Sequence, residues 1–148
     1  MQAIIFCGLQ ATGKTTFYRN HFLKTHIRIS LDMLNTRNKE SQFIELCLRT
    51  QQKFVVDNTN LTKVERAKYI EAAKARKFRV VGYYFESKVE DAIRRNSTRT
   101  GKENIPEIGI RGAYKRLERP GYEEGFDELY YVRIGEEGFV VREWQPSS

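Results

Sequence analysis

The sequence contains little cysteine, histidine and proline, and it has no long hydrophobic run. Its two cysteines, Cys7 and Cys47, and two histidines are too few for a disulfide framework or a conventional zinc site. The longest apolar segments, such as residues 3–7, are strand-sized and far short of the ~20 residues of a membrane helix. The first residues also lack the basic segment and cleavage site of a signal peptide. We therefore expect a cytoplasmic protein that does not associate with membranes.

Composition and charge indicate a globular chain with a basic surface. Hydrophobic residues make up 40% and charged residues 30% of the 148 residues, which excludes a disordered chain and suits one domain over residues 1–148. Residues 1–119 hold 24 Lys and Arg against 12 Asp and Glu, whereas residues 120–148 hold 2 against 7. The positive surplus indicates either a polyanionic partner or simply a soluble basic surface, and charge alone does not separate the two.

Strand-like and helix-like apolar segments alternate along the whole chain, which is typical of an α/β fold. Runs that are apolar without alternation predict buried parallel strands. We predict strands at residues 3–7, 26–30, 53–57 and 78–85, helices at 13–23, 41–49, 62–76, 87–97 and 106–118, and a C-terminal strand pair at 129–134 and 139–142. Thr62 and Ser87 each precede a glutamate by three residues, the spacing of a capping box, and are the expected helix caps. The predicted architecture is a mainly parallel sheet flanked by helices.

A phosphate-binding motif lies directly after the first predicted strand and directly before a helix. The pattern G-x-x-x-x-G-K-[ST] is matched by Gly8, Leu9, Gln10, Ala11, Thr12, Gly13, Lys14 and Thr15. The glycines let the backbone wrap around phosphate oxygens, and the amides at the helix start supply positive potential. We expect these residues and Thr16 to bind the phosphates of ATP, with Lys14 on the β- and γ-phosphates and the Thr15 hydroxyl on Mg²⁺. The alternative is an ordinary glycine-rich turn between a strand and a helix. The motif, placed between the first predicted strand and a helix, predicts a P-loop NTPase-type three-layer sandwich.

Two acids follow predicted strands, at the sheet edge where ligands bind in open α/β folds. Asp32 could accept the proton of an attacking hydroxyl group or could cap the start of a helix, and spacing alone leaves both roles open. Asp57 ends an apolar strand, the position of an acid that assists Mg²⁺ through water in phosphate-loop proteins. The polar run Asn58-Thr59-Asn60 that follows also suits a turn, and both roles can hold together.

An arginine-rich polar segment separates two of the predicted helices. It is surrounded by Arg94, Arg95, Arg99 and Lys102. Such a segment fits a helical lid that carries arginine over the γ-phosphate, where this side chain can raise the rate by about 10³ to 10⁵. It also fits a solvated, cationic helix end. The next helix carries Tyr114 among basic residues that suit a phosphodiester backbone, namely Arg111, Lys115, Arg116 and Arg119.

The order of these motifs resembles that of polynucleotide 5′-hydroxyl kinases. The phosphate loop is followed by Asp32, by Val55-Val56-Asp57-Asn58-Thr59-Asn60-Leu61, by Arg95-Asn96-Ser97-Thr98-Arg99 and by Ile105-Pro106. This arrangement is similar to the kinase domain of the phage and eukaryotic kinase-phosphatases, and the resemblance covers roughly residues 3–134. The D-N-T-N and R-N-x-x-R segments make it more specific than the phosphate loop alone.

The resemblance implies phosphorylation of the 5′-hydroxyl end of DNA or RNA, with ATP as the donor and Mg²⁺ as the metal. Asp32 then matches the general base of the family. Lys14 and Thr15 match the phosphate and metal ligands. Arg99 matches the lid arginine that contacts the donor phosphates, and Arg95 matches a second lid position.

The same resemblance implies an acceptor side that this sequence matches less closely. The family places an arginine shortly after the base to hold the acceptor's 3′ phosphate. Arg37 is the candidate here, but its register after Asp32 departs from that pattern and leaves acceptor recognition open. We expect the acceptor to be lined by Asp32, Arg37, Asn58 and Asn60.

Two other functions fit the loop, the acids and the lid. One is a P-loop kinase that phosphorylates a sugar, a nucleotide sugar or another small metabolite. The other is a non-catalytic module in which ATP binding switches an interaction. The basic surface favours a polynucleotide. The sequence contains no D-x-D-x-T phosphatase motif, so we expect any end-healing or ligase partner to lie on a separate chain.

Overall fold

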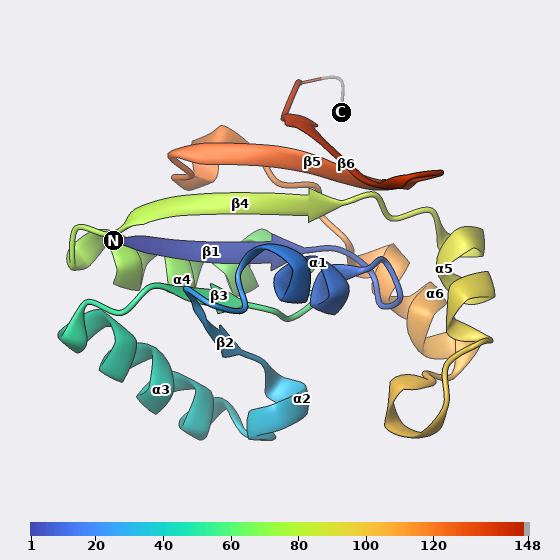
Figure 1. The fold of residues 1–148 in the computed structure, drawn as a ribbon, viewed down its shortest axis with the longest axis horizontal. Coiled ribbons are helices and arrows are strands. Elements are labelled where there is room, and N and C mark those ends of the chain that lie inside the picture. Colours follow the sequence, from blue (N-terminus) through green and yellow to red (C-terminus); the bar gives the residue numbers. More distant parts are fainter. Residues whose placement is uncertain (147–148) are drawn as a thin grey trace.

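A six-stranded sheet forms the centre of the computed structural model, which describes residues 1–146 (Figure 1). Its strands are β1 (Gln2–Cys7), β2 (Ile27–Ile29), β3 (Phe54–Val56), β4 (Arg79–Phe85), β5 (Glu128–Gly135) and β6 (Gly138–Glu143). They lie in the order β2-β3-β1-β4-β5-β6. The first five are parallel to their neighbours, and β6 is antiparallel to β5. The predicted mainly parallel sheet with a closing strand pair is confirmed.

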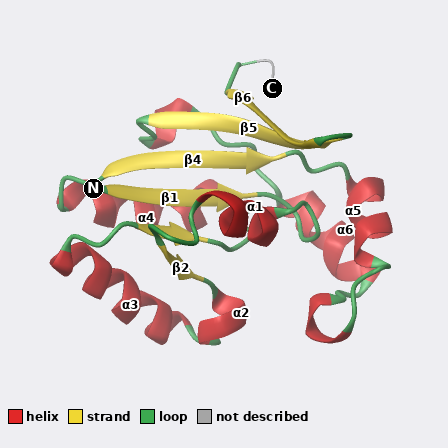
Figure 2. Cartoon of the chain, in the orientation of Figure 1, coloured by secondary structure: helices red, strands yellow, loops and turns green. Residues whose placement is uncertain are grey.

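Helices cover both faces of this sheet (Figure 2). They are α1 (Lys14–His21), α2 (Leu31–Leu34), α3 (Arg37–Thr50), α4 (Lys63–Ala75), α5 (Val89–Asn96) and α6 (Glu107–Arg116), with short 3₁₀ turns at Gly101–Glu103 and Tyr122–Glu124. Successive residues of a strand face opposite sides. Ala3 and Ile5 of β1 therefore share a cluster with α3 and α4, whereas Ile4 and Phe6 share one with α1. The predicted three-layer sandwich is confirmed.

A third apolar cluster attaches α5 and α6 to the phosphate-loop end of the sheet. Its buried members are Leu9, Leu61, Ala92, Ile110 and Ala113. The first two belong to segments that follow β1 and β3, and the other three belong to the two helices. Figure 1 shows α5 and α6 together beyond the carboxyl ends of β1 and β4. We call this pair and its connection the lid, since it stands at the edge where ligands bind in open α/β sheets.

One predicted helix cap differs in the structure. Thr62 caps α4 by accepting a hydrogen bond from the Glu65 amide at 3.1 Å, as the sequence predicts. Ser87 lies two residues before α5 and does not cap it. Its hydroxyl instead accepts from the Leu9 amide at 3.0 Å. The cap prediction for Ser87 is wrong because this hydroxyl fastens the phosphate loop to the end of β4.

The helix predicted at residues 41–49 begins four residues earlier, at Arg37. Its cap is Thr36, whose hydroxyl accepts from the Lys39 amide at 3.1 Å. This earlier start places Arg37 and Glu40 within α3.

Within residues 1–146, no helix combines the length and apolar character needed to cross a bilayer.

Candidate active site

The phosphate loop, residues 8–15, connects β1 to α1 and ends in a left-handed turn. Gly13 has φ 92°, a conformation that favours glycine, and it precedes α1 without any side-chain cap. The first amides of an α-helix have no partner within the helix. Those of Lys14, Thr15 and Thr16 are therefore the amides that a phosphate group would meet at the positive end of α1.

The first two residues of the loop, Gly8 and Leu9, donate their amides to other segments of the protein and are not available to a phosphate group. The Gly8 amide donates to the Thr59 carbonyl at 3.0 Å, and the Leu9 amide donates to the Ser87 hydroxyl. The Leu9 side chain is fully buried under the lid, and the Thr12 hydroxyl donates to the Leu9 carbonyl at 2.7 Å. Gly8 and Leu9 therefore fix the loop in place, and the residues after them are the ones left to bind phosphate.

Between these two halves the loop turns at Gln10 and Ala11. Ala11 adopts a left-handed backbone with φ 59°. The side-chain oxygen of Gln10 is buried, and it has no hydrogen-bond partner among the described residues. Buried acceptors are rarely left without a donor. This position therefore fits a loop whose polar contacts are completed by a ligand.

Lys14 is the charged centre of the loop. Its Nζ is buried and donates to loop carbonyl oxygens, at 3.0 Å for that of Gly8. Burial lowers the pKa of Lys14 to about 8, and the positive charge of Arg99 also lowers it. The carboxylates of Asp57 and Asp32 act in the opposite direction. The two acids and the lid arginine therefore lie within electrostatic range of one ammonium group.

The two predicted metal ligands lie side by side. The Thr15 hydroxyl donates to Asp57 Oδ2 at 3.0 Å, and Asp57 is only 5% exposed at the end of β3. Hydroxyl and carboxylate oxygens are ligands that Mg²⁺ accepts, and nucleotide phosphates and water usually supply the others. No group of three acidic, histidine or cysteine side chains that could hold a metal occurs within residues 1–146. The pair therefore fits a Mg²⁺ ion that is shared with a nucleotide.

Sequence reasoning misses Arg28, which lies on β2 between two isoleucines. Its Nε donates to Asp57 Oδ2 at 2.8 Å, and its Nη2 donates to Thr15 Oγ1 at 3.2 Å. The side chain is 19% exposed. Charged side chains are seldom this buried without a partner. The sequence did contain a signal, because an arginine within a short apolar strand needs an acidic partner. The strand ends at the same sheet edge as Asp57, which is the partner that the structure shows.

Asp32 lies at the start of α2, immediately after β2. The cap of this helix is Ser30, whose hydroxyl accepts from the Asp32 amide at 3.2 Å, so the alternative role of Asp32 as the cap is wrong. The Asp32 carboxylate is exposed, and it makes no hydrogen bond or ion pair with any residue in the range 1–146. It is thus available to a hydroxyl group at the carboxyl edge of the sheet.

A buried carboxylate organises the residues around α2. Glu40 is 2% exposed and accepts hydrogen bonds from the Tyr69 hydroxyl at 2.7 Å, from Asn58 Nδ2 at 2.8 Å and from Arg37 Nη1 at 3.2 Å. The Asn58 oxygen in turn accepts from the Leu31 amide at 2.9 Å. We call these four side chains the Glu40 network. It ties α3 and α4 to the first residue of α2, next to Asp32.

Of the residues predicted to line the acceptor, Arg37 and Asn60 differ most in their surroundings. The Arg37 side chain is 52% exposed although one of its nitrogens is bound in the Glu40 network. Asn60 is buried, and its Nδ2 donates to the Phe6 carbonyl at 2.7 Å. Its amide thus supports the end of β1 from within the protein, whereas the Arg37 guanidinium remains accessible.

The lid brings Arg95 and Arg99 to the phosphate loop. Both line a hollow of about 390 Å³ whose other walls are Ala11, Gly13, Thr16, Ile134, Gly138 and Phe139. Arg94 lies outside this hollow and pairs with Asp91 at 3.0 Å. The side chain of Lys102 lies outside the part of the structure that is described. The arginines of the R-N-x-x-R segment therefore face the loop, whereas their neighbour Arg94 does not.

Asn96, between the two lid arginines, holds the lid connection closed. Its Nδ2 donates to the Ile105 carbonyl at 2.6 Å, and its Oδ1 accepts from the Ile105 amide at 2.8 Å. The side chain is buried. The asparagine of the R-N-x-x-R segment is thus a structural clamp across residues 97–104, and the spacing of the two arginines around it follows from the turn that it closes.

The β5–β6 hairpin supplies the wall of the hollow opposite the lid, which sequence reasoning does not predict. Phe139 packs so closely on Gly13 that a Cβ at that glycine would lie 2.8 Å from the ring. Its ring also meets that of Phe17, at 5.2 Å between centroids. The glycine that the motif requires for phosphate is therefore also required by the hairpin.

Comparison with known proteins identifies the family of this chain. A family model described as an AAA domain matches residues 4–120, which include the phosphate loop, Asp32, Asp57 and the lid. The chain belongs to this family. Among curated relatives, the chain is 26% identical over 135 residues to the bifunctional polynucleotide phosphatase/kinase of Schizosaccharomyces pombe. The match covers 88% of the chain and 33% of the relative, so the chain spans about a third of that relative's length.

Solved structures show that the AAA domain has the fold of P-loop kinases. Kti12 of Chaetomium thermophilum in complex with ADP-AlF3 superposes with a TM-score of 0.71 at 17% identity, over 91% of this chain and 92% of that one. A gluconokinase of Sinorhizobium meliloti gives 0.62 at 17% identity, over 88% and 81%. The fold is therefore established, and at this identity it does not distinguish between acceptors. The sequence resemblance to polynucleotide kinases is confirmed by the curated relative.

The basic residues on the outer side of the lid are largely engaged within the AAA domain. Arg111 pairs with Glu107 at 2.9 Å and with Glu90 at 3.1 Å. Arg116 pairs with Glu65 at 2.8 Å. Arg119 lies over aromatic rings, those of Tyr84 and Trp144. The ion pairs of Arg111 and Arg116 reduce the positive charge that the lid helices offer to a polyanion.

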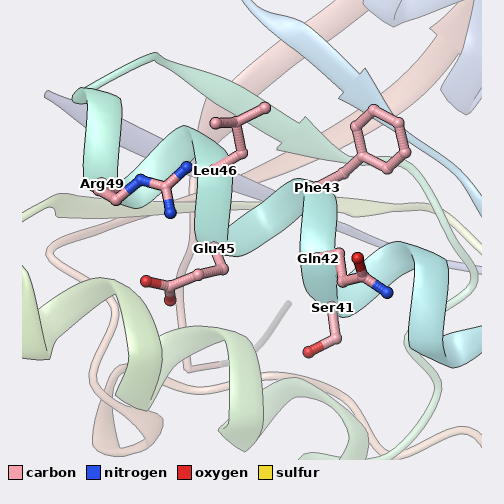
Figure 3. A pocket seen from close by; sticks show the side chains of 6 residues that line it. All are labelled: Ser41, Gln42, Phe43, Glu45, Leu46 and Arg49. Atoms are coloured by element: carbon pink, nitrogen blue, oxygen red, sulfur yellow. The ribbon is translucent and has the colours of Figure 1, made fainter.

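A second hollow of the AAA domain lies along α3, away from the loop. It measures about 610 Å³ and is lined by Ser41, Gln42, Phe43, Glu45, Leu46 and Arg49 (Figure 3). All of its lining residues belong to one helix, and Phe43 and Leu46 are exposed. Glu45 is paired with Arg76 at 2.6 Å. This hollow is larger, but it gathers no set of facing polar groups, and the phosphate loop remains the candidate site.

Proposed function

We propose that this P-loop kinase transfers the γ-phosphoryl group of ATP to the 5′-hydroxyl end of DNA or RNA. The observation that carries the proposal is the exposed, unbonded carboxylate of Asp32 near the buried ammonium group of Lys14. A general base and a phosphate-binding cation are the two groups that transfer to a hydroxyl requires on either side of the reacting phosphorus. The similarity to a polynucleotide phosphatase/kinase supports the choice of acceptor.

On the donor side, the start of α1 binds the phosphates. Lys14 and Arg99 place positive charge on the transferring phosphoryl group, where charge is spread over three oxygens in the transition state. The hollow between the lid and the hairpin, lined by Arg95 and Phe139, accepts the nucleoside. Aromatic and arginine side chains both offer flat faces on which a base can stack.

The Thr15 hydroxyl and, through water, the Asp57 carboxylate are the residues that would hold Mg²⁺. When bound there, the ion neutralises charge on the phosphates. Both oxygens lie at the carboxyl edge of the sheet, 3.0 Å apart, beside the first turn of α1.

On the acceptor side, Asp32 takes the proton of the attacking 5′-hydroxyl group. The hydroxyl oxygen bonds to the γ-phosphorus while the bond from that phosphorus to the β-phosphate oxygen breaks and releases ADP. Arg37, with an accessible guanidinium, binds the phosphate on the 3′ side of that nucleoside. Asn58 acts through its bond to the Leu31 amide and so positions α2. Asn60 supports the end of β1 through its hydrogen bond to the Phe6 carbonyl.

The test is incubation with γ-labelled ATP, Mg²⁺ and a panel of 5′-hydroxyl DNA and RNA oligonucleotides, with gluconate and other small hydroxyl compounds in parallel. We expect label on the 5′ end of oligonucleotides. Label that enters only the small compounds would assign the site to metabolite phosphorylation instead. ATP binding without transfer to oligonucleotides or to small compounds would favour the non-catalytic module, in which ATP binding switches an interaction.

Polynucleotide binding adds a salt test. Lysine and arginine that contact backbone phosphates release counterions, so the affinity for an oligonucleotide should fall as sodium chloride is raised. A flat salt profile would contradict recognition of a phosphodiester backbone by Arg37 and the lid.

A further inference from the structure

One arginine touches both residues of the metal site. Arg28 donates to Asp57 Oδ2 at 2.8 Å and to Thr15 Oγ1 at 3.2 Å. Its remaining terminal nitrogen, Nη1, lies 3.3 Å from the sulfur of Met33, the residue after Asp32. A single side chain on β2 thus contacts the start of α1, the end of β3 and the helix that carries Asp32.

Two cations would have to share the same oxygen ligands. A guanidinium group stays protonated throughout the physiological range, so Arg28 cannot become neutral when another cation approaches. Asp57 Oδ2 already accepts from Thr15 as well as from Arg28. A magnesium ion bound to these oxygens would repel the guanidinium group, and the repulsion is stronger at a partly buried site than in water.

We propose that Arg28 and Mg²⁺ compete for the Thr15–Asp57 pair, so that Arg28 sets the metal requirement of nucleotide binding. The inference rests on the proposed nucleotide site but not on the identity of the acceptor. Without the metal, Arg28 supplies positive charge at this end of the phosphates. With the metal, Arg28 releases the Thr15 hydroxyl, and its partly exposed side chain turns toward solvent.

The experiment measures binding of ADP by calorimetry, in EDTA and over a series of Mg²⁺ concentrations. The proteins are the wild type, Arg28→Gln, Arg28→Lys and the control Arg19→Gln, which changes an exposed arginine of α1. In Arg28→Gln we expect the half-saturating Mg²⁺ concentration to fall about 5- to 50-fold, within the usual range of coupling between two ligands. Its ADP affinity in EDTA should fall at least about threefold, because charge-assisted bonds to phosphate are lost.

The lysine variant separates charge from shape. Lysine keeps the positive charge but lacks the planar fork that spans two oxygens. We expect Arg28→Lys to shift the half-saturating Mg²⁺ concentration in the same direction by a smaller factor, and Arg19→Gln to leave it within about twofold of the wild type. If Arg28→Gln does not fold, as judged by its thermal melt, the shift in Arg28→Lys decides.

Three results would overturn the proposal. A higher half-saturating Mg²⁺ concentration in the Arg28 variants would mean that the arginine organises the metal ligands instead of competing for them. An unchanged value would mean that Arg28 only packs and pairs. A wild-type protein that binds no ADP would overturn the nucleotide site as well, whereas ADP binding without oligonucleotide phosphorylation would count against the proposed acceptor alone.

Discussion

The proposed donor side and the proposed acceptor side of the site are built in different ways. The phosphate loop is fixed by backbone hydrogen bonds and by the buried side chain of Leu9. Asp32, by contrast, lies on a helix of four residues. So short a helix does not hold itself together, and its position depends on the Ser30 cap and on the Glu40 network. The position of the phosphate loop is thus fixed by the backbone and core of the fold, whereas the position of Asp32 depends on a few side-chain hydrogen bonds.

The sharpest test of the acceptor side is Asp32→Asn. We expect the transfer rate to fall by about 10² to 10⁴, because the amide cannot take the hydroxyl proton. ADP affinity should stay within about twofold of the wild type, since Asp32 makes no contact with the loop backbone. Single-turnover assays and calorimetry measure the two effects. The control is Asp91→Asn, which changes an acid of α5 that pairs with Arg94. Activity of Asp32→Asn equal to that of the wild type would show that Asp32 is not the base.

On the donor side the largest effect is expected from Arg99→Ala. Loss of the lid arginine should lower kcat by at least about 10², because charge on the transferring group is left unbalanced. The matched control is Arg94→Ala, which removes an exposed arginine that pairs with Asp91 outside the hollow. That variant should change kcat by less than about twofold. Similar losses in both variants would show that the lid acts through its overall charge.

A smaller effect should follow from Glu40→Gln. The neutral side chain weakens the hold on Arg37 and Asn58, so the KM for a 5′-hydroxyl oligonucleotide should rise about tenfold while the KM for ATP stays the same. Initial rates with each substrate varied in turn measure the split. Glu45→Gln, an exposed glutamate on the same helix, is the control. An equal rise in both KM values would assign Glu40 to the stability of the whole edge.

The smallest effect concerns the hairpin wall. In Phe139→Leu the ADP affinity should fall by about 2- to 10-fold, since an aromatic contact contributes about 0.5–1.5 kcal/mol. The exchange keeps an apolar side chain over Gly13. Phe43→Leu changes an exposed aromatic residue of α3 and should leave ADP affinity unchanged. A Phe139 variant with wild-type affinity would place the nucleoside outside the hollow.

The donor side was largely predictable from the sequence because its chemistry follows from consecutive residues. A buried strand, the glycine motif and a helix occur in one stretch, and their spacing specifies backbone geometry directly. The basic residues of the lid could be predicted as a group, but it was the resemblance to polynucleotide kinases that singled out Arg95 and Arg99, the two that line the hollow. The sequence did not show that Asn96 closes that segment, although its place between the arginines is part of the same pattern.

The acceptor side depends on contacts between residues far apart in the chain, and these leave little local signal. Glu40 is charged and lies on a partly exposed helix, yet its carboxylate is buried, with hydrogen-bond partners from α3 itself, from the segment after β3 and from α4. Arg28 reaches Asp57 across the β2–β3 pair. Ser87 has the spacing of a helix cap, but its hydroxyl accepts a hydrogen bond from the distant Leu9 amide instead of capping α5. Tertiary contacts override local propensity in each case.

The C-terminal hairpin has a practical consequence for anyone who produces this protein. The family match ends at residue 120, before β5 and β6 begin. A fragment trimmed to that boundary would keep β1 on one side of β4 but would leave residues 81–85 of β4 unpaired on the side that β5 occupies. Unpaired apolar edges invite aggregation. Expression of a chain that includes β5 and β6 is therefore the safer choice, and affinity tags should be kept apart from the hairpin by a flexible spacer.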